Sequence, residues 1–329
     1  RTSPVLYAIR VSLVTQPISS ANALVFVLLI TMSTRKYNLP LHQHGKSRVR
    51  LGRVWREGNV HHMVEWNVFT MLESPMEHAF YEGDNAGMTA TDTQKNTVYI
   101  VAKRMQERCT VEQFAIALAQ HFVRTYPLVS RAKVHVEQKP WNRVNVDGMP
   151  HNHGYSINGT ETRTADVEYS KSGELQVTAG IKELQVLKTT QSGYVGYLKD
   201  EYTLLPESKD RIVATSVTST WRYSSQPACY ETAFNAARSA MIETFFGPPK
   251  QGVYSPSVQY TMYKMGEAML DRVQQIESIF MNCPNLHFIP CNPVTSSFDN
   301  DVYVATSEPH GDIECVVTRK NGRPHLSKL

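Results

Sequence analysis

The chain has 329 residues, of which 41% are hydrophobic and 19% are charged, and it is long enough for two compact globular domains. Its formal net charge is +4, and the basic residues are interspersed with acidic ones, so nucleic-acid binding is not expected. The five cysteines form no CxxC pair, which argues against a zinc knuckle and a disulfide framework and favours a reducing compartment.

The strongest apolar run is ANALVFVLLITM, residues 21–32. It is shorter than the roughly 20 residues that a membrane-spanning helix needs, so no membrane span is expected. Arg1 and Arg10 precede it, as in a signal peptide, but no small-residue cleavage pattern follows. We interpret the run as a fragment or gene-model artefact, ahead of a genuine extension or a targeting signal, and leave residues 1–40 out of the fold prediction.

The first strong elements beyond residue 40 are a helix at 110–126 and a strand at 132–141. Thr110 and Gln113 form a capping-box pattern at the start of the helix. Apolar residues then recur at helical spacing, namely Val111, Phe114, Leu118 and Phe122.

Strand patterns dominate the middle of the chain. Segments 173–180 and 183–190 are weak strands, and 212–224 is a long one. One face of this long strand carries Val213, Thr215, Val217, Ser219, Trp221 and Tyr223. A helix at 230–246 follows, with an apolar face made of Phe234, Ala237, Met241 and Phe245.

A third helix opens with Ser255 as the cap and Pro256 in the first turn. Its apolar stripe consists of Val258, Met262, Met265 and Met269, and we interpret it as core packing rather than a binding groove. Strand patterns at 301–309 and 311–320 complete the set. Long antiparallel strands with a few helices on one face predict an α+β architecture.

A weak internal repeat relates TDTQKNTVY, residues 91–99, to SPSVQYTMY, residues 255–263. Each begins with polar residues, continues with a helical pattern and is followed later by a strand, SRAKVHVEQKPW in one case and CPNLHFIPCN in the other. Such self-similarity indicates tandem copies of one unit. It also favours a helix after residue 91, with Thr91 and Asp92 at or just before its N-terminus.

Several known chemistries have no matching motif, because the chain has no Walker loop, GxGxxG, GxSxG or HExxH pattern. Histidine pairs occur as His42-x-His44, His61-His62 and His151-x-His153. No carboxylate or cysteine is spaced to complete a metal site with them, so no metal is expected.

Isolated polar residues remain, each with an ordinary interpretation as a solvated side chain, a cap or a strand end. They are Lys46, Thr91, Asp92, Arg211, Gln259, Asn285 and His287. Taken together with their neighbours, they resemble the urate oxidase (uricase) family. The motifs that carry the resemblance are GKSRVR, TATDTQKNTVYIVAK, VLKTTQSGY, DEYTLLPESKDR, YSPSVQYTMY and CPNLHF. The resemblance covers residues 42–320 and the terminal Ser-Lys-Leu, but not the first 40 residues.

This resemblance implies two tandem tunnelling-fold (T-fold) units, at 41–172 and 173–320, followed by a tail at 321–329. It also implies a homotetramer whose sheets close into a barrel around a tunnel, with active sites between subunits. One chain would offer Lys46, Thr91 and Asp92. Its neighbour would offer Tyr194, Arg211, Gln259, Asn285 and His287.

The family's roles carry over to these positions. Arg211 and Gln259 would hold the edge of urate, Tyr194 would stack where the family has Phe, and His287 with Asn285 would hold water or peroxide. Lys46, if neutral, would accept the proton of Thr91 and so turn it into a base. Backbone groups of Asp92 and Val258 would complete the rim, with Leu205 as apolar wall. Leu204 stands where the family often has Thr, so the rim is expected to be drier.

The resemblance further implies oxidation of urate by O2 and water to 5-hydroxyisourate and hydrogen peroxide, without a cofactor or metal. The terminal Ser327-Lys328-Leu329 predicts a peroxisomal address read by an import receptor. Two alternatives stay open. One is a purine- or pterin-binding T-fold protein with impaired turnover, and the other is a metal-dependent relative of the tunnelling-fold cyclohydrolases.

Overall fold

A computed structural model describes residues 35–291 and 302–326. The apolar run at 21–32 and the terminal Ser-Lys-Leu lie outside these ranges. The chain divides into two compact parts, Arg1–His42 and Gln43–Leu329, and the fold described below is that of the latter part.

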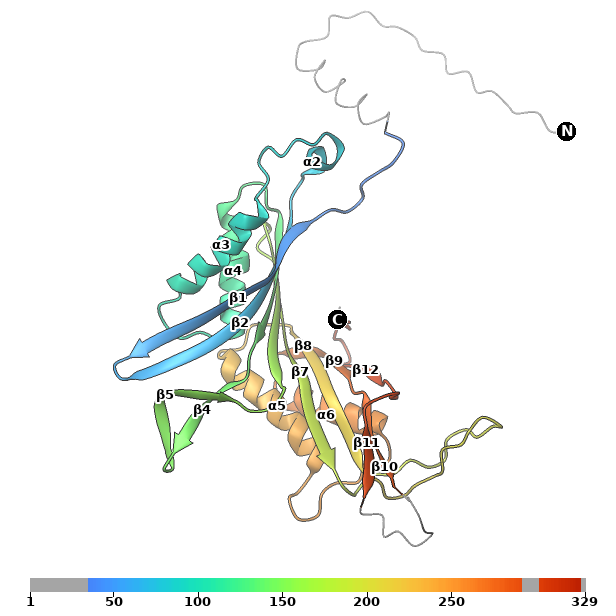
Figure 1. Cartoon of the computed structure of the whole chain (residues 1–329). Helices are drawn as coiled ribbons and strands as arrows, with labels where there is room; N and C mark the ends of the chain where they lie inside the picture. Colours follow the sequence, from blue (N-terminus) through green and yellow to red (C-terminus); the bar gives the residue numbers. More distant parts are fainter. Residues whose placement is uncertain (1–34, 292–301, 327–329) are drawn as a thin grey trace, which may run out of the picture. The chain divides into compact units, whose positions relative to one another are not determined.

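Ten strands of the described residues form one antiparallel sheet (Figure 1). They are β1 (His44–Glu57), β2 (Val60–Glu73), β3 (Arg131–Gln138), β6 (Thr162–Ser170), β7 (Leu175–Lys188), β8 (Val213–Tyr223), β9 (Ile276–Asn282), β10 (Asn285–Pro290), β11 (Tyr303–Thr306) and β12 (Glu314–Thr318). The order across the sheet is β1-β2-β3-β6-β7-β8-β10-β11, and β9 also pairs with β8 and carries β12 at its other side. A separate hairpin consists of β4 (Trp141–Val146) and β5 (Met149–Ile157).

The sheet has an apolar face and a polar face because side chains alternate along its strands. In β3, Ala132, Val134 and Val136 are buried, whereas Lys133 and His135 between them are only half-buried. Helices contact the sheet on the apolar side (Figure 1): α3 (Thr91–Arg104) and α4 (Val111–Thr125) over the first strands, α5 (Tyr230–Phe246) and α6 (Val258–Arg272) over the later ones. A short helix, α2 (Glu77–Tyr81), precedes α3.

The described chain contains the same ββααββ unit twice. The first copy, called the first unit below, is β1-β2-α3-α4-β3-β6. The second copy, called the second unit, is β7-β8-α5-α6-β9-β12. The strand order in the sheet is the same in both. This confirms the predicted α+β class with tandem units. The predicted register of the repeat is wrong, however: α3 is the first helix of its unit and α6 the second, so α3 corresponds to α5, and β3 corresponds to β9 rather than to β10. Polar residues before an apolar stripe mark the start of any helix, and they do not say which helix it is.

The helix starts also differ from the sequence prediction in detail. The capping box of Thr110 and Gln113 is confirmed. The cap of α6 is Ser257 rather than Ser255, since the Ser257 side chain accepts from the backbone N–H of Tyr260. The predicted position of Thr91 and Asp92 at a helix N-terminus is confirmed, since they are the first two residues of α3 after the N-cap Ala90, which has no capping side chain.

The two weak strand predictions at 173–180 and 183–190 belong to the single strand β7. Its pairing with β8 shifts register between Ile181 and Leu184. Glu183 lies at this irregularity with a φ of 59°, which is uncommon for a residue other than glycine. The bulge interrupts the two-residue alternation, which is why one long strand has the sequence pattern of two short ones.

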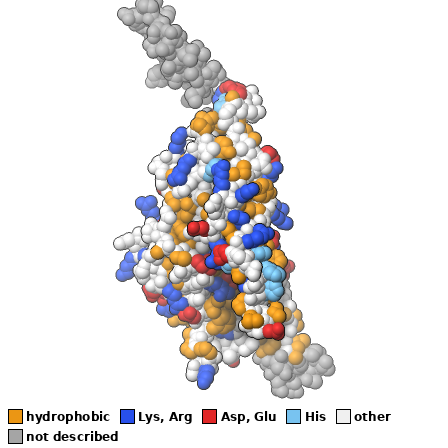
Figure 2. Space-filling model, turned by 90° about the vertical axis from the view of Figure 1, so that its left-hand side faces the viewer, with side chains coloured by type: hydrophobic (Ala, Val, Ile, Leu, Met, Phe, Trp, Pro, Cys, Tyr) orange, Lys and Arg blue, Asp and Glu red, His pale blue; other side chains and the backbone are white. Residues whose placement is uncertain are grey.

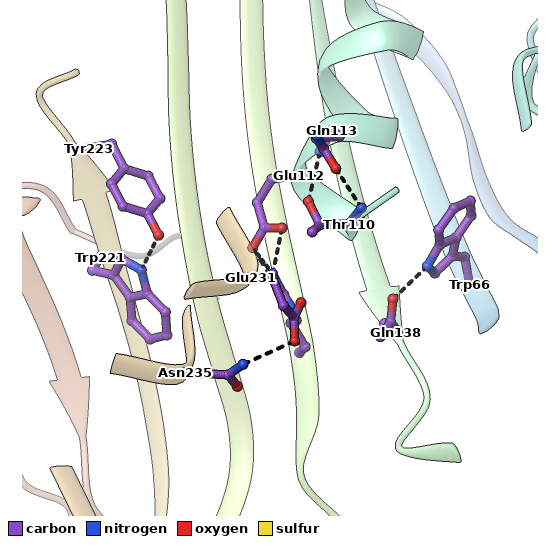
Figure 3. A network of polar contacts seen from close by, with 10 residues as sticks. Trp66, Thr110, Glu112, Gln113, Gln138, Trp221, Tyr223, Glu231 and Asn235 are labelled. Carbon is purple, nitrogen blue, oxygen red and sulfur yellow. Dashed lines mark hydrogen bonds and ion pairs between the residues drawn. The ribbon is translucent and has the colours of Figure 1, made fainter. Parts of the chain in front are cut away.

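An ion-pair network around Arg163 combines a buried pair within the first unit with a more exposed link to the second (Figure 3). The Arg163 guanidinium, on β6, lies 2.8 Å from Glu112 on α4 and 2.5 Å from Glu231 on α5. Its central carbon also lies 4.0 Å from the ring centroid of Phe234. Removing one partner of a buried pair costs about 3–5 kcal/mol, because the other charge is left unpaired. This cost applies to the Arg163–Glu112 pair, which stabilises the packing of α4 on β6, whereas the link to the second unit ends at Glu231, whose side chain is 55% exposed.

Candidate active site

The second unit contains a cavity of about 430 Å³ beside β10. Five of the predicted site residues line it, namely Tyr194, Leu205, Arg211, Asn285 and His287. The structure adds wall residues that the sequence did not single out, among them Thr189, Ile212, Phe288 and Tyr303. Phe288 follows His287 on β10, where alternation alone would place it on the other face, and Tyr303 comes from β11, far along the chain, so neither had a sequence signal of its own.

Backbone hydrogen bonds hold the loop walls of this cavity together. The N–H of Tyr194 donates to the carbonyl of Ser208 at 2.7 Å, and the N–H of Ser208 donates back at 3.2 Å. The N–H of Arg211 donates to the carbonyl of Ser192 at 2.8 Å. Two segments of the connection between β7 and β8 thus gain a fixed register. They deliver Tyr194 and Arg211 to one cavity.

The Arg211 guanidinium is the main charge in the cavity wall. It is half-buried, and its Nε is buried without a hydrogen-bond partner. Its carbon lies 5.3 Å from the Tyr194 ring centroid, and Tyr197 stacks on Tyr194 at 4.7 Å between centroids. Burial lowers the pKa of Arg211, and the nearby tyrosines oppose that shift. A buried donor without an acceptor is costly, and a planar anion in the cavity would supply the acceptor.

Asn285 and His287 come from alternate positions of β10, so their side chains share one face of the strand. Asn285 pairs with Thr215 of β8, and His287 pairs with Thr306 of β11. The Asn285 N–H donates to the carbonyl of Gly311 at 2.8 Å. An amide and an imidazole therefore face the cavity from a strand anchored on both sides.

Val258 and Gln259 do not line this cavity. They open α6, where Val258 is buried and Gln259 is exposed. The segment before them is bonded to the Tyr194 loop, because the N–H of Gly193 donates to the carbonyl of Ser255 and the N–H of Ser255 donates to that of Gln191, both at 2.9 Å. The start of α6 is therefore tied to the cavity wall.

The other predicted residues lie in the first unit. Lys46 is half-buried on β1, and its N–H lies 3.3 Å from the Thr70 hydroxyl of β2. A Cβ on Gly45 would lie 1.8 Å from the Thr70 carbonyl oxygen, so the strands approach closely only because this residue is glycine. A register shift follows between Lys46 and Val49.

Thr91 and Asp92 form the exposed start of α3. The Asp92 carboxylate accepts from Lys95 at 2.5 Å and from Asn96 at 2.9 Å. The hydrogen bond from Lys95 is the main reason that the pKa of Asp92 is lowered, and the charge of Lys46 adds to the effect. Asp92 thus carries a negative charge at the helix start, while the first backbone N–H groups lie beside it.

One chain keeps these two groups of residues apart. Lys46 lies on β1 at one edge of the sheet, whereas Asn285 and His287 lie on β10, six inter-strand steps away. At about 4.8 Å per step the separation is roughly 29 Å. Figure 1 shows β1 and β10 at opposite ends of the sheet. A small molecule that touches both groups would have to lie between two chains.

Among the described residues, no group of three His, Cys, Asp or Glu side chains is arranged to hold a metal ion. Two histidine pairs do meet at the β4–β5 hairpin, where the ring of His153 lies 4.5 Å from that of His151 and 5.9 Å from that of His61. These rings pack edge to face or tilted.

On the face drawn in Figure 2, basic side chains are scattered, with acidic and hydrophobic ones between them. Within residues 35–291 and 302–326, no helix combines the length and hydropathy of a membrane span.

Similarity to known proteins extends over most of the chain. A family model described as Uricase matches residues 42–168 and 177–314. The uricase of Arabidopsis thaliana is 45% identical over 293 residues, which is 84% of this chain and 94% of the relative. Uricase-2 isozyme 1 of Glycine max is 46% identical with the same coverage. The crystal structure of uricase from Arthrobacter globiformis superposes with a TM-score of 0.82 at 35% identity, covering 89% of this chain and 98% of that one.

Proposed function

The chain belongs to the uricase family and is an oxidoreductase that oxidises urate with oxygen, and from that premise we propose how its own residues carry out the reaction. Urate, O2 and water become 5-hydroxyisourate and hydrogen peroxide. The purine loses two electrons and two protons, O2 takes up both to become peroxide, and water adds across the oxidised purine with its oxygen at C5. The urate dianion is electron-rich enough to reduce oxygen without a cofactor.

The observation that carries this assignment is the Arg211 guanidinium, which faces the cavity with a buried Nε that lacks a partner. Within the described residues, no carboxylate lies within ion-pair distance of it. Urate is flat and anionic, so the planar guanidinium matches its edge with two hydrogen bonds. Gln259, from the segment tied to the cavity wall, supplies an amide donor and acceptor for the same edge.

The remaining groups of this half-site orient the purine and the oxygen species. Tyr194 offers an aromatic ring for stacking, and Leu205 with the backbone of Val258 closes the apolar rim. Asn285 and His287 hold water or peroxide above the purine face, and His287 relays protons. These roles require β10 and the loop segments that carry Tyr194 and Arg211 to keep their positions relative to each other.

The first half-site comes from a second copy of the chain. Thr91 removes a urate proton through its hydroxyl, and Lys46 in its neutral form accepts the proton of the threonine. The backbone N–H groups at Asp92 face the anion. Support comes from the separation of roughly 29 Å, since six strand spacings part β1 from β10 within one chain. We propose a homotetramer with four such sites, built from T-fold units at 41–172 and 173–320.

We also propose that Ser327-Lys328-Leu329 addresses the protein to the peroxisome through an import receptor. The support is chemical: the reaction releases peroxide, and that compartment contains enzymes that destroy it. A fusion of a fluorescent protein to residues 321–329 tests the address, with deletion of the last three residues as the control. A cytosolic signal from the intact fusion would refute it.

The experiment for the activity uses the purified, chelator-treated chain. We expect the ultraviolet absorbance of urate to fall while peroxide rises in equal molar amount, and we expect the mass in solution to be that of four chains. Binding without turnover would favour the purine- or pterin-binding alternative. Activity that disappears only with the chelator would favour a metal-dependent enzyme.

A further inference from the structure

Lys188, the last residue of β7, is held by three neutral acceptors. Its Nζ lies 3.2 Å from the carbonyl oxygen of Phe245, 2.6 Å from that of Val253 and 2.9 Å from the hydroxyl of Ser255. An ammonium group has three N–H donors, so all of them are used. In the described part of the chain, no carboxylate lies within 4.0 Å of it. Burial lowers the pKa of Lys188, as expected for a half-buried charge without a counter-ion.

All three acceptors belong to the end of α5 and the connection that leads to α6. Phe245 is in the last turn of α5, and Val253 and Ser255 follow it. The Ser255 hydroxyl also accepts from the Thr261 hydroxyl of α6 at 2.8 Å. Ser255 is 2% exposed, so the hydroxyl is shielded from competing water. Lys188 therefore fixes the connection at both ends, just before Ser257 caps α6.

Ser255 continues this contact chain into the cavity wall. Its backbone forms two hydrogen bonds with the segment 191–193, and a parallel bridge pairs Ser255 with Ser192. The carbonyl of Ser192 then accepts from the N–H of Arg211 at 2.8 Å. Three segments meet at this point: the one that carries Tyr194, the one that carries Arg211 and the one that leads to Gln259. Lys188 itself does not line the cavity.

We propose that Lys188 is a positioning residue of the urate site, which acts through Ser255 to keep Tyr194, Arg211 and Gln259 in register. It touches neither urate nor oxygen. The inference rests on the proposed function, because it concerns the substrate-binding half of that same site. Its expected signature is weaker urate binding with little change in the chemical step.

The central experiment replaces Lys188→Met, which keeps the length of the side chain and removes the three donors. Without oxygen the enzyme cannot turn over, so the equilibrium Kd for urate can be measured by calorimetry under nitrogen. We expect Kd and KM to rise roughly tenfold, because displaced binding groups lose much of their contact, while kcat stays within about threefold of wild type. Lys182→Met is the matched control, since Lys182 lies on the same strand and pairs with Glu137. We expect its KM to stay unchanged, even where its Tm falls.

Rescue separates positioning from general destabilisation. Treating Lys188→Cys with 2-bromoethylamine restores an ammonium group at nearly the original length, and the wild type treated in parallel accounts for the other cysteines. We expect the KM of the treated variant to return to within about threefold of wild type, because the three donors are present again. A wild-type KM in Lys188→Met, or no rescue of Lys188→Cys, would overturn the proposal.

Ser255→Ala keeps the test decisive if Lys188→Met does not fold. It removes one acceptor of Lys188 and leaves the backbone bonds in place, so we expect a smaller rise in Kd, about threefold. An unchanged Kd in this variant would count against the positioning role. If the wild type neither binds nor oxidises urate, the proposed function fails and this inference fails with it. If the wild type is active and every Lys188 variant matches it, only the inference fails.

Discussion

The two units of this chain have the same ββααββ order, yet their contributions to the site differ in kind. The second unit contains a cavity beside β10, and its loop walls are hydrogen-bonded to each other. The first unit offers an open surface, where Thr91 and Asp92 are exposed and Lys46 is half-buried. In the proposed site, one copy of the repeat is the binding pocket and the other presents the reactive edge.

This contrast has a physical cause in the connections between elements. The long segment between β7 and β8, residues 189–212, carries Tyr194, Leu205 and Arg211 into the cavity. In the first unit, β1 and β2 are joined by a tight turn at Gly58, where φ is 61°. A two-residue turn leaves no chain to build a wall. This is why we propose that the first unit acts together with the pocket of another chain.

Replacing Lys46→Met should have the largest effect, because a proton acceptor contributes roughly 10²- to 10⁴-fold to a rate. We expect kcat to fall about 10³-fold while the anaerobic Kd for urate changes less than about threefold. Lys103→Met, in the last turn of α3, is the control and should leave kcat unchanged. A Kd that rises as much as kcat falls would show that Lys46 binds substrate instead.

Replacing Arg211→Gln should weaken binding next most strongly. The loss of two charge-assisted hydrogen bonds to urate corresponds to a rise of about 100-fold in the anaerobic Kd. Calorimetry under nitrogen measures it directly, and Arg272→Gln, an exposed partner of Glu243, serves as the control. Wild-type affinity in Arg211→Gln would contradict the division of labour between the units.

Mixing the two inactive chains tests whether the units of different chains meet. If Lys46→Met and Arg211→Gln chains assemble at random, about a quarter of the sites combine an intact Lys46 edge with an intact Arg211 pocket. The co-expressed mixture should then regain about a quarter of the wild-type rate. A mixture as inactive as its parents, with hetero-oligomers verified by native mass spectrometry, would place both half-sites within one chain.

The smallest expected effect concerns the tail that covers the polar face of the second unit. The two ring nitrogens of His325 lie 2.9 Å from the Ser278 hydroxyl and 3.2 Å from the Thr220 hydroxyl, and burial lowers the pKa of this histidine from 6.5 to about 4. Below pH 6.5 the unfolded chain binds a proton that the folded protein does not, so this contribution to stability is present above pH 6.5 and is lost as the pH falls toward 4.

Scanning calorimetry between pH 4 and 7 measures this contribution. The Tm of the wild type should fall by about 2–3 °C more over this range than the Tm of His325→Asn, which has no imidazole to titrate. Both hydroxyl partners of His325, Ser278 on β9 and Thr220 on β8, belong to the second unit, so the pH effect on stability is assigned to that unit. Parallel curves for the two proteins would contradict the assignment.

The sequence predicted features that depend on neighbouring residues. The capping box of α4, the bounds of α5 and the alternation in β8 all follow from local periodicity and capping. The β4–β5 hairpin was not predicted, and the correspondence between α3 and α5 was mistaken, because pairing partners are set by contacts far apart in the chain.

The candidate site shows the same division. Resemblance to a family pointed to Arg211, Asn285 and His287, and the structure lines one cavity with them. Two features depended on the folded chain: the stacking of Tyr197 on Tyr194, and the separation of β1 from β10. Lys188 had no sequence signal of its own, since its three acceptors lie 57 to 67 residues away.

The pairing of β6 with β7 has a mechanical consequence for substrate capture. Those strands are hydrogen-bonded from Thr162 opposite Lys182 to Tyr169 opposite Leu175, so the two units share one uninterrupted ladder. Bending between them would break that ladder, and hinges form where few such bonds must be given up. The protein is stiff along the direction in which many two-lobed enzymes close. The two units therefore cannot fold onto each other like hinged lobes, and we expect a ligand of the cavity to be selected by how well it fits rather than by closure of one unit onto the other.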